Sequence, residues 1–235
     1  MIPWIDSADS FPPLELALAE PNGLLCAGAD LSPTTLLRAY CGGIFPWYSA
    51  GQPILWWSPD PRMVLVPGEL RISRSLRRTL RRGAYRIRLD SDFPAVIRAC
   101  ASTRRKGQSG TWITAAMQSA YCALYELGHA HSVETWVDGT LVGGIYGLAI
   151  GRMFYGESMF SHASNASKIA LAHLARFLET RGYGLIDCQM NTAHLASLGA
   201  REIPRRNFIA RLRELTTMAS PTGRWPVDGA SPIWP

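Results

Sequence analysis

The fold is decided by residues 131–189, which begin HSVETWVDGTLVGGIYGLAIGRMFYGESMF. Polar and apolar side chains alternate over residues 131–137, as they do in a half-buried strand. Asp138-Gly139 is a two-residue turn that matches the twist of paired strands, and residues 140–150 form the return strand. A second turn leads into residues 153–160. We therefore predict an antiparallel meander of three strands.

The rest of this stretch adds a helix and a fourth strand. Apolar residues recur at helical spacing over residues 166–181, and Gly182 provides a stop signal. Residues 185–190, LIDCQM, are typical of a short strand that ends with an acid and an amide. Three strands, a helix and a strand predict an α+β domain. Polar side chains at the ends of its central strands make that edge a candidate site.

Composition indicates a soluble globular protein. The chain has 235 residues, of which 47% are hydrophobic, so it can bury a full core. No run approaches the roughly 20 apolar residues that span a bilayer. The first residues lack the basic start and apolar segment of a secretory signal. We therefore expect a cytoplasmic protein with no membrane partner.

The cysteines indicate free thiols. They are odd in number and widely spaced, without the pairing of a zinc or redox motif: Cys26, Cys41, Cys100, Cys122 and Cys188. Cys188 lies beside the candidate site. A buried strand cysteine is favoured over a nucleophile there, because no histidine nearby in sequence could activate the thiol.

Positive charge is concentrated in one part of the chain. The net charge is +6 and the pI about 9.3. Basic residues are concentrated in residues 71–106, and residues 102–110 form a polar, basic loop. Ser73 can cap a helix that turns Leu76 and Leu80 inward and presents a basic face made of Arg74, Arg77, Arg78, Arg81 and Arg82. This face suits phosphates of a nucleic acid, although a solvated helix would have the same pattern.

The first part of the chain differs in composition from the rest. Residues 1–62 are rich in Pro, Gly, Trp and Leu and predict a small N-terminal domain, followed by a second domain over residues 63–235. Its aromatic residues favour a compact core over a base-stacking surface. Further elements are expected as strands at 63–66 and 85–89, and as helices at 33–41, 93–101, 115–127, 194–200 and 206–217. Trp225 and Trp234 should pin an extended C-terminal tail.

Eight motifs occur together in order along the chain. They are PNGLL (21–25), GIFPW (43–47), WWSPDPR (56–62), GTWIT (110–114), HAHS (129–132), GESMFS (156–161), ASK (166–168) and DCQ (187–189). In this order and spacing the chain resembles the leucyl/phenylalanyl-tRNA–protein transferase family. The C-terminal domain of that family is similar to acetyltransferases of the GNAT superfamily, which agrees with the predicted order of strands and helix.

The resemblance implies a reaction. Leucine or phenylalanine would move from the 3′ end of aminoacyl-tRNA to the α-amino group of a protein that begins with Arg or Lys, marking that protein for degradation. No metal and no other cofactor is implied. Aminolysis needs a neutral amine, whereas an α-ammonium group near pKa 8 is mostly protonated at pH 7.

Asp187 and Gln189 are the catalytic candidates. On a regular strand both side chains would point into one cleft, with Cys188 pointing away. The resemblance assigns them as a relay in which Asp187 orients Gln189 beside the attacking amine. Because an amide is a poor base, positioning and electrostatic stabilisation are favoured over proton abstraction. The ribose hydroxyl of the substrate could carry the proton instead, and a solvated strand end would also explain the pair.

Other site residues follow from the resemblance. Glu157, a carboxylate in an apolar strand, would bind the cationic N-terminal residue, although a structural salt bridge with an arginine is the alternative. An apolar aminoacyl pocket would contain Ile145, Met159, Leu171, Leu174, Leu178 and Ile186. Contacts with the tRNA 3′ end would come from Tyr40, Trp47, Trp112 and Tyr121. Each of these residues could equally serve packing.

The chain departs from the family pattern at one point, and two alternative functions remain. After Gln189, asparagine occurs at position 191, one residue earlier than the family pattern, so Thr192 could substitute for it. An acetyl-CoA-dependent acetyltransferase is disfavoured, because residues 162–166 contain no glycine for a pyrophosphate-binding turn. A tRNA-binding protein without catalysis is the other alternative. The moderate size favours a monomer.

Overall fold

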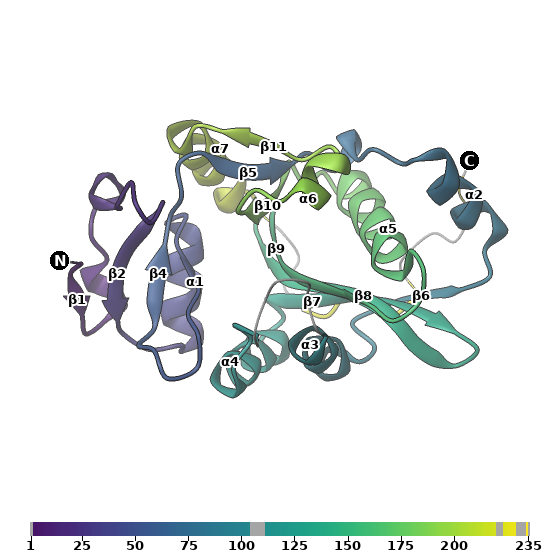
Figure 1. The fold of residues 1–235 in the computed structure, drawn as a ribbon, viewed down its shortest axis with the longest axis horizontal. Coiled ribbons are helices and arrows are strands. Elements are labelled where there is room, and N and C mark those ends of the chain that lie inside the picture. The colour runs from purple at the N-terminus through teal and green to yellow at the C-terminus, as the bar shows by residue number, and fades with distance from the viewer. Residues whose placement is uncertain (1, 104–110, 220–222, 229–233, 235) are drawn as a thin grey trace.

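The computed structural model describes residues 2–103, 111–219, 223–228 and 234. Within these ranges the strands form two sheets, one at each side of helix α1 (Figure 1). Most of the predicted basic loop, including residues 104–106, lies outside the described residues. None of the helices described in these ranges is long and apolar enough to cross a membrane.

The N-terminal sheet has four strands in the order β1-β2-β4-β3. These strands are β1 (Trp4–Ile5), β2 (Leu24–Gly28), β3 (Phe45–Pro46) and β4 (Leu55–Trp57). Helix α1 (Pro33–Cys41) begins where predicted, because the Ser32 hydroxyl accepts the Thr35 N–H at 3.3 Å and Pro33 occupies the first turn. Trp56 is fully buried, which confirms a core role for that aromatic side chain.

The second sheet has seven strands in the order β11-β5-β10-β9-β8-β7-β6. Its strands are β5 (Arg62–Leu65), β6 (Arg86–Leu89), β7 (Ala130–Val137), β8 (Thr140–Ile150), β9 (Met153–Ser161), β10 (Leu185–Gln189) and β11 (Arg201–Ile203). The meander β7-β8-β9 is antiparallel, and β10 pairs with β9 in parallel. The predicted order of three strands, a helix and a strand is therefore confirmed, as is the α+β class.

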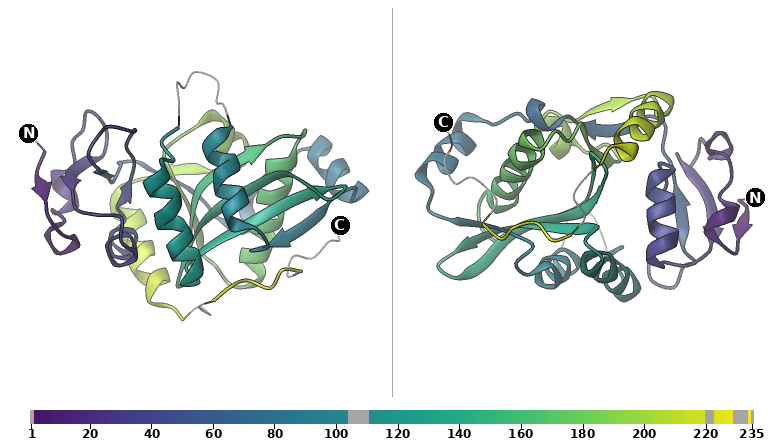
Figure 2. Two further views of the ribbon diagram at one scale, coloured as in Figure 1. Left: turned by 90° about the horizontal axis from the view of Figure 1, so that it is seen from below. Right: turned by 180° about the vertical axis from the view of Figure 1, so that it is seen from behind.

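Helices cover both faces of this sheet. Helix α5 (Ala166–Thr180) packs on one face against β7 and β8, whereas α3 (Phe93–Ser102) and α4 (Ala115–Glu126) lie side by side on the other (Figures 1 and 2). Gly143 permits the close approach of α5, because a Cβ atom there would lie 2.4 Å from the Ala166 Cβ. The remaining helices are α2 (Arg74–Arg82), α6 (Ala193–Ser197) and α7 (Arg205–Thr217), with 3-10 turns at Ala8–Ser10, Leu14–Leu16 and Pro67–Glu69.

The basic helix α2 forms as the sequence predicts. The Ser73 hydroxyl accepts the Leu76 N–H at 3.2 Å, and Gly83 ends the helix in the left-handed conformation with φ of 62°. Leu76 and Leu80 are buried. All of the arginines of this helix are exposed, and together they line a surface hollow of about 450 Å³.

The described part of the C-terminal tail runs along the sheet (Figure 2, right). Trp225 stacks on the His131 ring at a centroid distance of 4.0 Å, and its backbone N–H donates to Asp90 Oδ2 at 2.7 Å. Trp234 Nε1 lies 3.0 Å from His173 Nε2. The two tryptophans anchor the tail, as predicted.

Helix α1 lies between the two sheets and contacts both α4 and α7 (Figure 1). One hydrophobic cluster continues from the N-terminal sheet into the second sheet, including Trp56, Tyr40 and Tyr121. The domain boundary at residue 62 therefore stays a prediction. The packing places the end of α1 next to the central strands of the large sheet.

Candidate active site

Two strand irregularities open the centre of the large sheet. Parallel pairing of β9 with β10 ends at Tyr155 and Asp187. Beyond that point, β9 bulges at Glu157, because Gly156 lies opposite Gly147 whereas Ser158 lies opposite Tyr146. Strand β10 has a second register shift between Asp187 and Gln189. Pairing between β9 and β10 therefore stops short of Glu157 and Gln189.

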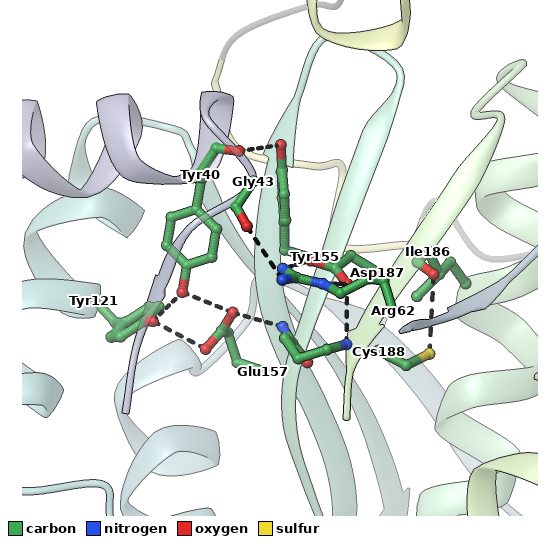
Figure 3. A network of polar contacts seen from close by, with 10 residues as sticks. Tyr40, Gly43, Arg62, Tyr121, Tyr155, Glu157, Ile186, Asp187 and Cys188 are labelled. Atoms are coloured by element: carbon green, nitrogen blue, oxygen red, sulfur yellow. Dashed lines mark hydrogen bonds and ion pairs between the residues drawn. The ribbon is translucent and has the colours of Figure 1, made fainter. Parts of the chain in front are cut away.

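Glu157 is the centre of the site. Its Oε1 accepts a hydrogen bond from the Tyr40 hydroxyl at 2.8 Å, and its Oε2 accepts one from the Tyr121 hydroxyl at 2.9 Å (Figure 3). The two tyrosine hydroxyls are also hydrogen-bonded to each other. Gln189 Nε2 donates to Glu157 Oε1 at 3.2 Å. Helices α1 and α4 and strands β9 and β10 therefore converge on one carboxylate.

Burial dominates the electrostatics of Glu157. The pKa of this carboxyl is raised to about 7, mainly by desolvation and also by the Asp187 charge, although the two tyrosine hydrogen bonds and the Arg62 charge act to lower it. Burial and the Glu157 charge raise the pKa values of Tyr40 and Tyr121 well above the usual range, so both phenols stay protonated donors. The ionised and neutral forms of Glu157 are thus both accessible near neutral pH.

Asp187 forms a different kind of contact. Arg62 Nε and Nη2 donate to its two carboxylate oxygens at 2.8 and 2.6 Å, and neither residue is exposed to solvent (Figure 3). Arg62 Nη1 also donates to the Gly43 carbonyl at 3.1 Å, and the guanidinium carbon lies 4.7 Å from the ring centroids of Phe45 and Phe208. This bidentate pair joins β5, β10 and the segment after α1.

Asp187 and Gln189 point to the same side of β10. The Asp187 carboxylate pairs with Arg62 and the Gln189 amide reaches Glu157, whereas Cys188 packs in the hydrophobic cluster around α5 (Figure 3). The register shift and the positive φ of Gln189, 56°, change the contact between the two residues, because Asp187 Oδ1 accepts the backbone N–H of Gln189 at 2.9 Å. Asp187 therefore holds the backbone of Gln189 and makes no described contact with its amide side chain.

The structure also corrects the expectation for two aromatic residues. Tyr40 and Tyr121 are fully buried, so neither ring offers a face on which an adenine could stack. Their hydroxyls bind Glu157 instead. Trp47 and Trp112 are half-buried and keep accessible surface, so their assignment to the tRNA 3′ end stays a prediction.

The six apolar candidates lie in one hydrophobic cluster. Five of them are buried, and Met159 is partly exposed at its border: Ile145, Leu171, Leu174, Leu178 and Ile186 form the buried set. Their use as an aminoacyl pocket stays a prediction. Cys188 is buried, and desolvation raises the pKa of its thiol far above the usual range, so the interpretation as a structural cysteine fits this environment.

Residues after β10 have a structural role. The Thr192 hydroxyl accepts the Leu195 N–H at 3.2 Å and so caps the short helix α6. Asn191 is exposed. Thr192 therefore does not substitute for a site asparagine in this arrangement.

The role of Arg62 was missed by the sequence interpretation. Arg62 marked a boundary and ended one motif, although an arginine at the start of an otherwise apolar strand, RMVL, needs a buried partner. The predicted alternative of an arginine salt bridge for Glu157 is wrong, since the described residues place no Lys, Arg or His within ion-pair distance of it. An ionised Glu157 with two phenol donors is suited to receive a cation from outside the chain.

Comparison with known families agrees with the sequence motifs. The model for the leucyl/phenylalanyl-tRNA protein transferase family matches residues 64–213, and the model for its N-terminal domain matches residues 29–60. A protein of Nitrosospira multiformis named leucyl/phenylalanyl-tRNA–protein transferase is 61% identical over 228 residues, covering 97% of this chain and 98% of the relative. The protein of the same name from Azoarcus sp. is 59% identical over 225 residues, covering 96% and 95%.

Solved structures give a weaker likeness. L-PGS from Bacillus licheniformis covers 72% of this chain and 54% of its own, with 11% identity and a TM-score of 0.38. A GCN5-related N-acetyltransferase from Kribbella flavida covers 72% and 60%, with 12% identity and a TM-score of 0.36. Likeness at this level carries no weight for function. The family match and the near-complete coverage of the relatives are decisive: the chain belongs to the leucyl/phenylalanyl-tRNA–protein transferase family.

Proposed function

We propose that this protein transfers leucine or phenylalanine from aminoacyl-tRNA to the α-amino group of cytoplasmic proteins that begin with Arg or Lys, which marks them for degradation. In this reaction the amine nitrogen attacks the ester carbonyl carbon. A C–N bond forms, the C–O bond to the terminal ribose breaks, and the amine proton ends on the departing ribose oxygen. The names of the relatives support aminoacyl transfer from tRNA to protein.

The observation that carries the acceptor specificity is the environment of Glu157. Its carboxylate accepts two phenol hydrogen bonds, which favour the ionised form, yet it has no ion-pair partner among the described side chains. A guanidinium or ammonium group from the acceptor would supply the missing positive charge. Binding of that cation should lower the pKa of Glu157 from about 7 and keep the carboxylate ionised.

Gln189 is the group we assign to the attacking amine. Its Nε2 is engaged by Glu157, which leaves its amide oxygen as an acceptor for an N–H of the amine. The backbone bond to Asp187 fixes its position, and Arg62 in turn fixes Asp187. Asp187 and Arg62 are thus positioning residues, and Gln189 contributes orientation of the nucleophile rather than outright proton abstraction.

The donor would be held by two kinds of contact. Trp47 and Trp112 keep exposed surface for the terminal adenosine, whose stacking contributes roughly 1–3 kcal/mol per base. The exposed arginines of α2 would hold phosphates of the tRNA body, with affinity that falls as salt rises. The partly exposed Met159 marks the side on which an aminoacyl group could enter the apolar cluster.

The test is transfer of radiolabelled leucine from Leu-tRNA at low salt to three peptides that differ only at the first residue. They begin with Arg, with Nα-acetyl-Arg, and with citrulline, the neutral isostere of Arg. We expect transfer to the Arg peptide, none to the acetylated peptide and weak transfer to the citrulline peptide. Equal transfer to Arg and citrulline peptides would overturn the role of Glu157, and absence of all transfer would overturn the reaction.

A further inference from the structure

A second cavity lies at the edge of the large sheet, away from Glu157. It has a volume of about 600 Å³ and is bounded by the segment that leaves α2, by β6, and by the tip of the β7–β8 hairpin. The side chains that give it chemical character are Arg86, Arg88, Trp136 and Asp138. No role in the proposed reaction accounts for this group.

Strand geometry places the two arginines on one face. Strand β6 is an edge strand, and Arg86 and Arg88 are two residues apart, so both side chains point the same way. Both are exposed, and the described residues place no carboxylate within ion-pair distance of either. Arg86 lies directly opposite Trp136 on β7. An aromatic ring and two available guanidinium groups therefore share this face.

The ring of Trp136 is held in place. Its Nε1 donates to Glu134 Oε2 at 3.1 Å, and the guanidinium carbon of Arg88 lies 5.5 Å from its ring centroid. The Trp136 side chain is only half-buried. Planar aromatic and guanidinium groups are the surfaces on which unpaired bases stack in RNA recognition. The cavity thus combines a fixed stacking platform with a free cation, Arg86.

Asp138 narrows the class of ligand. This exposed turn residue lines the same cavity and carries a negative charge. A simple anion would gain from Arg86 but be repelled by Asp138. A nucleotide can use both, because its phosphate pairs with the guanidinium and its amino or ribose hydroxyl groups can donate to the carboxylate.

The location indicates which part of a nucleic acid could reach the cavity. It begins at Gly83, directly after the arginines of α2, so the hollow lined by those arginines and the cavity adjoin along the chain. Trp136 lies opposite Leu141, whereas Glu157 bulges opposite Tyr146 and Gly147. Two strand intervals and about five residues separate the two points, which is on the order of 20 Å. A terminal adenosine bound at Glu157 could not also occupy the cavity.

We infer that this cavity binds an unpaired nucleotide in the body of the tRNA, with the base against Trp136 and Arg88 and a phosphate on Arg86. The inference rests on the proposed function, since it takes tRNA as the donor. It adds a recognition point that reads an extruded base, beyond the sequence-independent phosphate contacts assigned to α2.

The test compares two donors and four variants. The donors are Leu-tRNA and 3′-leucyl-adenosine, which carries the reacting end alone. The variants are Arg86→Ala, Trp136→Leu, Trp136→Phe and, as a control of equal charge change on an exposed site of α7, Arg213→Ala. Kd for tRNA is measured at several salt concentrations, and transfer to an Arg peptide is measured with both donors.

We expect Trp136→Leu to weaken tRNA binding about tenfold without changing the salt dependence, and Trp136→Phe to restore most of the affinity. Arg86→Ala should weaken binding and reduce the slope of log K against log salt by about 0.7–0.9, as loss of one phosphate contact requires. Transfer from 3′-leucyl-adenosine should be the same in every variant as in the wild type.

Two results would overturn the inference while leaving the proposed function intact. In the first, Arg86→Ala and Trp136→Leu bind tRNA as tightly as Arg213→Ala does. In the second, these variants lose as much transfer activity with 3′-leucyl-adenosine as with Leu-tRNA. Arg86 is exposed, so its variant keeps the test decisive even if Trp136→Leu fails to fold. A wild type that transfers from neither donor would overturn the proposed function, and the Kd series would still decide the cavity.

Discussion

Two acidic residues on neighbouring strands, one fully buried and one half-buried, have opposite kinds of partner. Asp187 on β10 is fully buried and has its counter-cation built in, because Arg62 donates to both of its oxygens. Glu157 on β9 is held by neutral donors, the hydroxyls of Tyr40 and Tyr121 and the amide of Gln189. One pair is complete within the chain, whereas the other lacks a cation.

The difference assigns separate roles. A buried bidentate ion pair is rigid, so Asp187 can fix the backbone of Gln189 from behind. A carboxylate with only neutral donors keeps its attraction for a cation, and its pKa of about 7 makes that attraction sensitive to pH. The first acid holds the structure, and we propose that the second recognises the acceptor.

Breaking the ion pair between Arg62 and Asp187 should have the largest effect, a loss of unfolding free energy. Arg62→Met would leave the Asp187 charge buried and unpaired, which costs about 3–5 kcal/mol of unfolding free energy. Urea denaturation measures the loss. The matched control is Arg211→Ala, which breaks an exposed pair with Glu214 and should cost about 0–1 kcal/mol.

The double variant Arg62→Met, Asp187→Leu separates stability from positioning. Removal of both charges should recover most of the unfolding free energy, because an apolar pair replaces a buried ion pair at little cost. Transfer activity should stay low, since the Gln189 N–H has lost its acceptor. Full activity in the double variant would show that Asp187 does not position Gln189.

Neutralising Glu157, the acid without a cationic partner among the described residues, should affect recognition of the acceptor peptide instead of stability. Glu157→Gln keeps the size of the side chain and removes its charge. We expect kcat/KM for a peptide beginning with Arg to fall about 30-fold, as loss of a charged hydrogen bond of roughly 2 kcal/mol implies. A citrulline-first peptide should change little. An equal fall for both peptides would indicate a general defect and contradict the comparison of the two acids.

Much of this architecture could be predicted from the sequence, because local rules govern it. Strand alternation, the Asp138-Gly139 turn and the Ser73 cap all act within a few residues. Glu157 was identifiable as a polar residue within an apolar strand. Its surroundings were not, since Tyr40 lies 117 residues away in sequence and Tyr121 lies 36 away, and both are brought in by packing of α1 and α4.

The contact between Asp187 and Gln189 shows where such reasoning fails. Strand periodicity predicts that residues 187 and 189 share a direction, but it does not predict the bulge and the left-handed backbone at Gln189, where the backbone N–H and not the amide binds the Asp187 carboxylate. Nothing in the letters DCQ signals that bulge. The partner of Asp187 is Arg62, which is 125 residues distant.

Removing one of the phenol hydroxyls that donate to Glu157 tests how neutral donors control the ionisation of this carboxyl. In Tyr40→Phe and Tyr121→Phe, one hydrogen bond that lowers the pKa of Glu157 is lost, so that pKa should rise further. At pH 7 a smaller fraction is ionised, and KM for an Arg peptide should increase several-fold for a bond of about 1 kcal/mol.

The matched control is Tyr125→Phe, also on α4, whose hydroxyl donates to the Asp90 carbonyl at 2.8 Å instead of to Glu157. It should leave the pH dependence of KM unchanged. If Tyr125→Phe moved that profile as far as the other two variants, the phenols would have no special link to Glu157.

The raised pKa of Glu157 also predicts a pH dependence of stability. The folded-state pKa of Glu157, about 7, exceeds its ordinary value of 4.5, so the native state binds more protons than the unfolded state between those values. Unfolding free energy should therefore fall as pH rises from about 4.5 to 7. The decline should be shallower in Glu157→Gln, measured by urea denaturation at closely spaced pH values. A steeper decline in the variant would contradict the raised pKa.

The most direct test is the titration of Glu157 itself with and without a cationic acceptor. Carbon NMR of protein labelled at the glutamate carboxyl carbon follows the signal, which is assigned by its absence in Glu157→Gln. We predict that the pKa of Glu157 in the free protein is near 7. It should fall when a peptide beginning with Arg binds and should not change with the citrulline peptide. A pKa that is unmoved by the Arg peptide would show that Glu157 does not receive the acceptor's charge.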